Sequence, residues 1–207
     1  MKTVLNILGQ LRIYTLVDLA LLIYVAGGRG QIFWGVILLW IGFLAYLEAQ
    51  HKHSYRVKIP QALWVIFLIV GLVLFKRIEG IGFIIASYFY TRKDHENYGI
   101  FAPFFRGLQN LLLVGGIAGF DNVLTWLVLI LIIIRNILGD IRDAGKDVNE
   151  GMKTLPILFG LRKNVSTVHL VGVLGTTFVW WHYSELSVMF LLVIWVVQLA
   201  TYNLTPR

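Results

Sequence analysis

The densest set of polar residues in this sequence lies at residues 135–147, directly after a long apolar run. At 100° per residue of an α-helix, Asn136, Asp140, Asp143 and Asp147 fall within about 60° of one another. Three carboxylates on one helical stripe repel each other unless a cation lies between them. Mg²⁺ prefers such oxygens, keeps several waters and shares phosphate oxygens. The spacing is therefore suited to a Mg²⁺ site that binds a phosphate group.

A second interpretation of the same segment needs no metal. Arg142 and Lys146 alternate with the acids, so the stripe could be one face of a solvated helix end with salt bridges along it. The spacing alone leaves both interpretations open.

The elements that position this segment follow from the composition. Of 207 residues, 58% are hydrophobic and only 14% are charged, whereas charged residues make up about a quarter of an ordinary soluble domain. The apolar residues form separate runs along the whole chain, which indicates an integral membrane protein. A net charge of +7 then indicates basic loops at a membrane rather than a nucleic-acid partner, and the zero cysteines exclude disulfides and thiolate metal sites.

The apolar runs predict an all-α, polytopic helix bundle formed by a single domain over residues 1–207. Runs such as Trp126–Ile134 are apolar at every position and lack the alternation of a membrane β-barrel. We expect eight transmembrane helices, at 12–27, 31–49, 61–75, 78–90, 104–119, 122–139, 164–181 and 186–201.

Lysines and arginines are distributed very unevenly between the two sides of this arrangement. With the first turn inside the cell, fifteen of the 18 basic residues lie on the cytoplasmic side, and only Arg29, Lys76 and Arg77 lie outside. The positive-inside rule produces such a split. We therefore predict a multi-pass protein with both its N- and C-termini in the cytoplasm.

The segment from Asp140 to Gly160 resembles the second aspartate-rich motif of the UbiA superfamily of intramembrane prenyltransferases. It reads Asp-Ile-Arg-Asp-Ala-Gly-Lys-Asp-Val-Asn-Glu-Gly-Met-Lys-Thr-Leu-Pro-Ile-Leu-Phe-Gly. Two shorter segments are also similar to the family: Arg-Ile-Tyr-Thr-Leu at 12–16, near the start of the chain, and Tyr-Thr-Arg-Lys at 90–93, after the expected fourth helix.

The resemblance implies helices around a central cavity and transfer of a prenyl group from a polyprenyl diphosphate to a lipophilic or aromatic acceptor. It implies Mg²⁺ held by Asp140, Asp143 and Asp147, which are also the catalytic residues. The implied diphosphate-binding residues are Arg92, Lys93 and Lys153, and we place Asn136 with them because it shares the helical stripe of the aspartates.

The first aspartate-rich motif of that family has no counterpart here. The segment expected to carry it contains Glu48 as its only acid, and Lys52 and Arg56 occupy the aspartate positions when Glu48 is aligned with the start of the motif. The chain also has eight expected spans where the family usually has nine, which leaves one side for a second copy of the chain or for lipid to cover.

Two accounts of this missing motif remain open. In the first, Lys52 and Arg56 bind the diphosphate directly and replace one metal. In the second, the protein is a catalytically degenerate relative that binds a lipid or a prenyl diphosphate without reacting. Whether the chain is an enzyme is therefore undecided by its sequence, and a transporter that uses its intramembrane acid is a further alternative.

Asp18 is the acid in the first apolar run. A charge at the centre of a bilayer costs about 2.5–3.5 kcal/mol on insertion scales, so Asp18 should face the protein interior. We expect Asp18 and Glu48 to line the cavity for acceptor or diphosphate, and the alternative for Asp18 is a structural hydrogen bond between helices.

Overall fold

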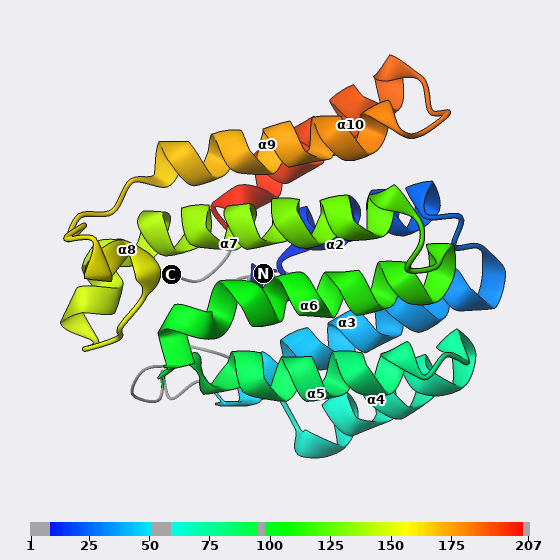
Figure 1. Ribbon diagram of the computed structural model, residues 1–207, viewed down its shortest axis with the longest axis horizontal. Helices are drawn as coiled ribbons and strands as arrows, with labels where there is room; N and C mark the ends of the chain where they lie inside the picture. Colours follow the sequence, from blue (N-terminus) through cyan, green and yellow to red (C-terminus); the bar gives the residue numbers. More distant parts are fainter. Residues whose placement is uncertain (1–8, 51–58, 95–97, 205–207) are drawn as a thin grey trace. The chain divides into compact units, whose positions relative to one another are not determined.

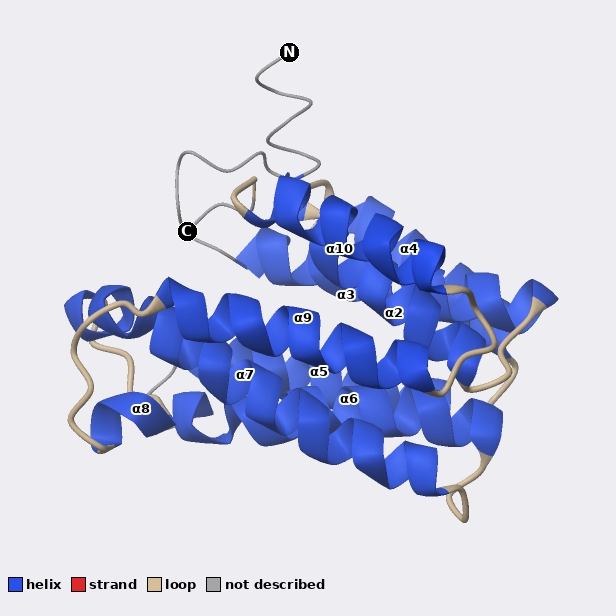
Figure 2. Cartoon of the chain, turned by 90° about the horizontal axis from the view of Figure 1, so that it is seen from above, coloured by secondary structure: helices blue, strands red, loops and turns tan. Residues whose placement is uncertain are grey.

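The computed structural model describes residues 9–50, 59–94 and 98–204, and these residues form helices joined by turns, with no strand among them (Figures 1 and 2). The long helices are α2 (Ile13–Val25), α3 (Gly30–Gln50), α4 (Gln61–Phe75), α5 (Glu79–Thr91), α6 (Tyr98–Ala118), α7 (Val123–Asn149), α9 (Ser166–His182) and α10 (Val188–Tyr202). Two short elements, the 3-10 helix η1 (Arg92–Asp94) and α8 (Leu155–Leu158), complete the described part.

Each of the eight apolar runs in the sequence coincides with one of the long helices, which confirms the all-α prediction. Two helices extend further than the apolar runs do. Helix α6 begins at Tyr98 and passes through Pro103, and α7 continues ten residues past Gly139 to Asn149. Residues 140–149, which include five charged side chains, therefore extend α7 rather than forming a loop after it.

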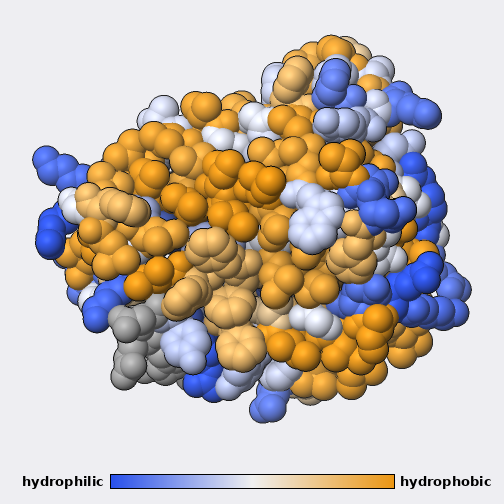
Figure 3. Space-filling model, viewed as in Figure 1, coloured by the Kyte–Doolittle hydropathy of each residue, from blue (hydrophilic) through white to orange (hydrophobic). Residues whose placement is uncertain are grey.

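Among the residues that the structure describes, three helices are long and apolar enough to cross a membrane: α3, α6 and α7. The 27 residues of α7 rise about 40 Å, whereas the hydrocarbon core of a bilayer is about 30 Å thick. Its apolar part, residues 123–139, is followed by the charged end, which extends beyond it. Figure 3 shows many apolar side chains on the visible surface. On α7, the apolar residues Trp126, Ile130 and Ile134 are exposed. These features indicate a membrane protein.

The helices form two compact units. Unit 1 comprises residues 1–80 and 177–207, and unit 2 comprises residues 81–176. The boundaries fall inside α5 and α9, so most of α9 belongs to unit 2 and its last turns belong to unit 1.

The α3–α4 hairpin of unit 1 is packed through glycines. A Cβ added at Gly35 would lie 2.5 Å from the backbone nitrogen of Phe75, and one at Gly71 would lie 2.8 Å from the backbone nitrogen of Leu39. Nearer the loop, the rings of Tyr46 and Trp64 have centroids 4.8 Å apart. Small residues let membrane helices approach this closely, where apolar burial gives little driving force between helices.

The α6–α7 hairpin of unit 2 is closed by a short turn, 119–122. Gly119 has a φ of 89°, and the Asn122 side chain caps α7 by accepting a hydrogen bond of 2.9 Å from the Leu124 nitrogen. The Thr125 hydroxyl donates to the Gly119 carbonyl at 2.7 Å. Gly107 brings the two helices together, because a Cβ there would lie 2.6 Å from Cγ1 of Ile133.

Candidate functional site

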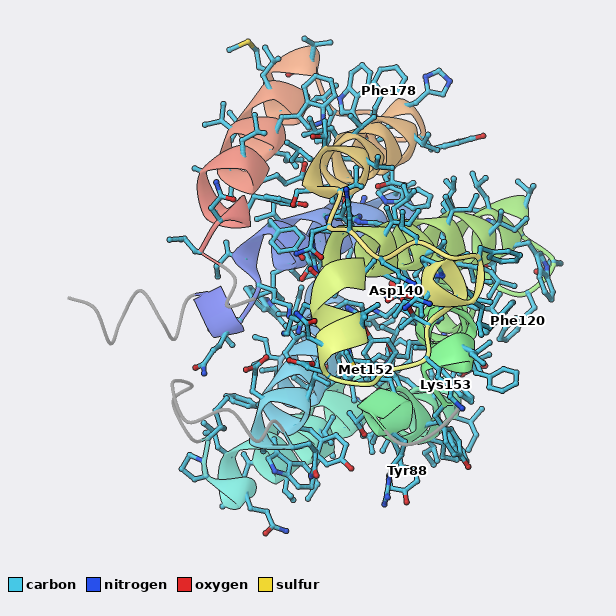
Figure 4. All side chains as sticks on the ribbon, turned by 90° about the vertical axis from the view of Figure 1, so that its left-hand side faces the viewer. Tyr88, Phe120, Asp140, Met152, Lys153 and Phe178 are labelled. Carbon is cyan, nitrogen blue, oxygen red and sulfur yellow. The ribbon has the colours of Figure 1, made fainter. Side chains whose placement is uncertain are left out.

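The charged end of α7 carries the stripe of polar residues that the sequence predicted. Asn136, Asp140, Asp143 and Asp147 all lie within the continuous helix Val123–Asn149, so their predicted spacing on one face holds. Figure 4 views this end of unit 2 and labels Asp140 on α7, with Met152 and Lys153 on the segment before α8.

Two oxygens of this stripe are buried without a hydrogen-bond partner among the described residues. They are Oδ1 of Asn136 and Oδ2 of Asp140, which lie one helical turn apart. An unsatisfied buried acceptor costs about 1–3 kcal/mol, and more if it is charged. Two such acceptors, four residues apart, fit a ligand that supplies positive charge or hydrogen-bond donors.

Asp143 forms hydrogen bonds with the adjacent Arg142. Arg142 donates from Nε to Oδ1 of Asp143 at 2.8 Å and forms a second contact from Nη2 to Oδ2. Nη1 of Arg142 lies 3.4 Å from Nδ1 of His169, a buried residue of α9. The Arg142–Asp143 ion pair is the kind of salt bridge that the interpretation without a metal predicted for this helix end. Among the described residues it involves Asp143 alone of the three aspartates.

Lys93 is the basic residue that acts most clearly on the aspartates. It lies on η1, and its ammonium group acts electrostatically on Asp140, Asp143 and Asp147. Beyond the apolar part of α7, burial raises the pKa of Asp147 to about 6, although Lys93 opposes this effect. Burial acts in the same direction on Asp143, but the hydrogen bonds from Arg142 hold its pKa below the usual value.

The other predicted basic residues are placed differently. Arg92 donates from Nη2 to the hydroxyl of Tyr88 at 2.7 Å and covers that ring, so it points along its own helix. Lys153 is exposed, and its backbone carbonyl would lie 2.5 Å from a Cβ at Gly99. Lys52 and Arg56 lie outside the described residues.

The chain that follows α7 folds back onto the helix. Gly151, with a φ of 71°, ends α7 in a Schellman motif in which the Met152 nitrogen donates to the Asp147 carbonyl at 2.8 Å. At the far end of this loop, Oδ1 of Asn164 accepts from the Gly145 nitrogen at 2.7 Å. The segment 151–165 is therefore fixed to α7 at both ends.

The fit of a divalent cation can be judged from these contacts. Across residues 9–50, 59–94 and 98–204, no three His, Asp or Glu side chains converge closely enough to hold a metal. The partnerless oxygens of Asn136 and Asp140 nevertheless suit a hard cation, and Asp147 follows two turns later on the same stripe. Mg²⁺ commonly uses one or two carboxylates and completes its shell with water and phosphate oxygens, so the residues present fit that ion.

In unit 1, Asp18 belongs to a hydrogen-bond network between helices. The hydroxyl of Thr177 on α9 donates to Oδ1 of Asp18 at 2.5 Å, and Nε2 of Gln198 on α10 donates to the Thr177 hydroxyl at 2.6 Å. All three side chains are buried. This network has the geometry of the structural alternative for Asp18.

Glu48 is also buried in unit 1, and its role in lining a cavity stays a prediction. Its Oε1 lies 3.8 Å from Nη2 of Arg12. Arg12 directly precedes α2 and Glu48 lies in the last turn of α3, so this ion pair joins the two helices.

A second buried polar group, in unit 2, was not singled out from the sequence. Arg106 of α6 donates to Oε1 of Gln109 at 3.0 Å, Gln109 donates to the Ser87 hydroxyl at 2.6 Å, and the Arg106 guanidinium lies 5.3 Å from the centre of the Tyr90 ring. The signal in the sequence was the spacing of Arg106, Gln109 and Asn110 on one face of an apolar helix, since polar residues inside a membrane face the protein interior.

Comparison with known proteins finds no matching family model, no similar curated protein and no similar solved structure.

Proposed function

We propose that this chain is a prenyltransferase of the UbiA type that works within the membrane. It would transfer a prenyl group from a polyprenyl diphosphate to a lipophilic or aromatic acceptor. The observation that carries the proposal is the pair of buried oxygens of Asn136 and Asp140 that have no hydrogen-bond partner among the described residues. They lie at the charged end of an apolar helix, and Lys93 acts electrostatically on Asp140. Asp140 is the first residue of the segment that resembles the second aspartate-rich motif, and Asn136 lies one turn before it on the same helix.

The proposal places eight helices across the membrane, with both termini in the cytoplasm. Helices α2, α4, α5, α9 and α10 have 13 to 17 residues and rise about 20–26 Å. To span about 30 Å they need flanking residues or local thinning of the bilayer. The uneven distribution of lysine and arginine supports this topology.

In this proposal the charged end of α7 binds the diphosphate through Mg²⁺. Asn136 and Asp140, one turn apart, would hold one ion, and Asp143 would join them once it leaves Arg142. Asp147 lies about 10 Å further along α7 and would hold a second Mg²⁺ on the same diphosphate. The bound Mg²⁺ would neutralise the diphosphate and stabilise the charge that develops on it. Lys93 and Lys153 add positive charge at the same end of unit 2, and Lys52 and Arg56 are proposed as further diphosphate ligands.

The reaction cleaves the bond between the prenyl carbon and the diphosphate oxygen. The electron pair leaves with the diphosphate, and an electron-rich atom of the acceptor bonds to the allylic carbon and then loses its proton. Apolar helix surfaces would exclude water from the allylic cation, which water would otherwise capture. The role of the chain is thus to bind the leaving group with cations and to keep the carbon end dry.

The test is binding and turnover of farnesyl diphosphate by the full-length protein in detergent or nanodiscs, with and without Mg²⁺. Asp140→Asn and Asp147→Asn are the variants, and Glu150→Gln is the matched control, because Glu150 lies on the same helix end but its carboxylate faces Lys146 at 3.8 Å. We expect Mg²⁺-dependent binding that both variants lose and the control keeps.

Other outcomes separate the two accounts of the missing first motif. Binding without Mg²⁺ that is lost in a Lys52→Ala/Arg56→Ala double variant would move the diphosphate site to those residues. Binding without turnover, across a range of aromatic and lipid acceptors, would support the catalytically degenerate relative. Absence of binding under all conditions would refute the proposal.

A further inference from the structure

The segment between α7 and α9 presents two apolar side chains to the outside. Phe159 is 87% exposed and Leu158 is 57% exposed, at the end of α8 (Leu155–Leu158), where Gly160 with a φ of 85° terminates the turn. Isolated exposed apolar residues are ordinary on a protein surface. The position of Leu158 and Phe159 at the edge of the apolar zone of α7 instead suits them to contact lipid.

The level of this segment along the helices follows from contacts within unit 2. Gly107 of α6 meets Ile133 of α7, and the two helices run antiparallel through a short turn. Gly99 lies eight residues before Gly107, and Ile141 lies eight residues after Ile133. At 1.5 Å per residue both lie about 12 Å from the Gly107–Ile133 contact, so they are at about the same height along the two antiparallel helices. Ile141 is only two residues, about 3 Å, beyond Gly139, where the apolar part of α7 ends.

Both ends of the segment are tied to that level. The Lys153 carbonyl packs against Gly99, where an added Cβ would lie 2.5 Å away. The Val165 nitrogen donates to the Ile141 carbonyl at 3.3 Å. Residues 153–165 therefore begin and end at the edge of the apolar zone of α7, and the exposed Leu158 and Phe159 lie between these two anchor points.

The charges of the segment complement an anionic lipid surface. Residues 151–165 contain Lys153, Arg162 and Lys163 and no Asp or Glu, and all three basic side chains are exposed. Apolar and aromatic side chains with flanking cations are the composition that binds the interface between headgroups and acyl chains. Anionic headgroups attract basic residues next to a membrane within a Debye length of the surface.

We propose that residues 153–163 form a lipid-binding segment that inserts Leu158 and Phe159 into the boundary of the bilayer leaflet and places Arg162 and Lys163 among anionic phospholipid headgroups. This interaction depends on the membrane location of the chain and not on prenyl transfer, so it can be tested separately from catalysis.

The zero cysteines of the chain allow a clean test with a single introduced cysteine. An environment-sensitive fluorophore is attached at Phe159→Cys in the full-length protein, in nanodiscs of phosphatidylcholine with or without phosphatidylglycerol. Asn149→Cys, exposed at the end of α7, is the water reference, and Ile130→Cys, 55% exposed in the apolar part of α7, is the lipid reference. Quenching by nitroxide lipids and by aqueous iodide is measured at each position.

We expect the label at 159 to be quenched by a nitroxide near the headgroups several-fold more than the label at 149, and to be more strongly quenched in nanodiscs with phosphatidylglycerol. The double variant Arg162→Gln/Lys163→Gln should remove most of the phosphatidylglycerol effect. Iodide quenching at 159 equal to that at 149, or protection of 159 from both quenchers, would overturn the proposal, since the first places the segment in water and the second places it against protein.

Discussion

Replacing Thr177 by valine should destabilise unit 1, because this hydroxyl links three helices. It donates to Oδ1 of Asp18 on α2 at 2.5 Å and accepts from Nε2 of Gln198 on α10 at 2.6 Å. Valine has nearly the same shape but makes neither bond. Asp18 is 4% exposed and Gln198 is fully buried, so water does not readily replace the lost hydroxyl.

The size of the effect depends on which of two scales applies. A hydrogen bond to a charged group contributes about 1.5–3 kcal/mol in proteins, whereas hydrogen bonds between membrane helices average about 0.6 kcal/mol with a maximum near 1.7. The variant loses two bonds, one of them to a carboxylate, while Gln198 keeps a contact of 3.4 Å with Asp18. We therefore expect a loss of about 2 kcal/mol in the free energy of unfolding.

The adjacent Thr176 provides the matched control. Its hydroxyl donates to the carbonyls of Gly172 and Val173 within its own helix, at 2.7 and 3.0 Å. Thr176→Val should therefore change the free energy of unfolding by less than about 0.5 kcal/mol.

Unfolding in mixed micelles with increasing dodecyl sulfate, followed by circular dichroism, measures both variants. Equal effects at the two positions, or a Thr177→Val variant as stable as the wild type, would show that the network does not hold these helices together. In that case Asp18 would return to the cavity-lining role expected from its position in the sequence.

Two further predictions follow from close contacts. Gly35→Ala should destabilise the α3–α4 hairpin by about 1–3 kcal/mol, because its Cβ would meet the backbone of Phe75. The control Gly175→Ala has no atom within 4 Å of the added Cβ, so it should be neutral or stabilising by up to about 1 kcal/mol. The same unfolding assay compares the two variants, and equal effects would contradict the packing argument. Arg142→Gln should free Asp143 for cation binding and tighten Mg²⁺ binding severalfold in isothermal titration, and weaker binding would show that the ion pair supports the site.

The polar groups of unit 2 are divided between two kinds of partner. Arg142 donates to Asp143 and also lies beside His169, while Asn136 and Asp140 keep oxygens without a partner among the described residues. Asn136 and Asp140 are therefore the residues of the stripe that we propose as cation ligands, because Asp143 already has a cationic partner.

The sequence by itself determined where the helices are. Apolar runs separated by charged or glycine-rich breaks predicted all eight long helices, because hydrophobicity and span length are local properties of the chain. Reading helices from apolar runs placed the end of α7 at Gly139, because this method detects only the apolar part of a helix. The polar and charged residues up to Asn149 continue the helix.

Only the tertiary structure decided which polar groups meet. Thr177 and Gln198 lie 159 and 180 positions from Asp18, and His169 lies 27 positions from Arg142, so no local pattern predicts these contacts. Hydrogen bonds require a donor and an acceptor within about 3 Å in a suitable direction. That proximity is set by how closely the helices pack. For the contact between Arg142 and His169, α9 packs on α7 through Gly172, where an added Cβ would clash with the Leu138 side chain.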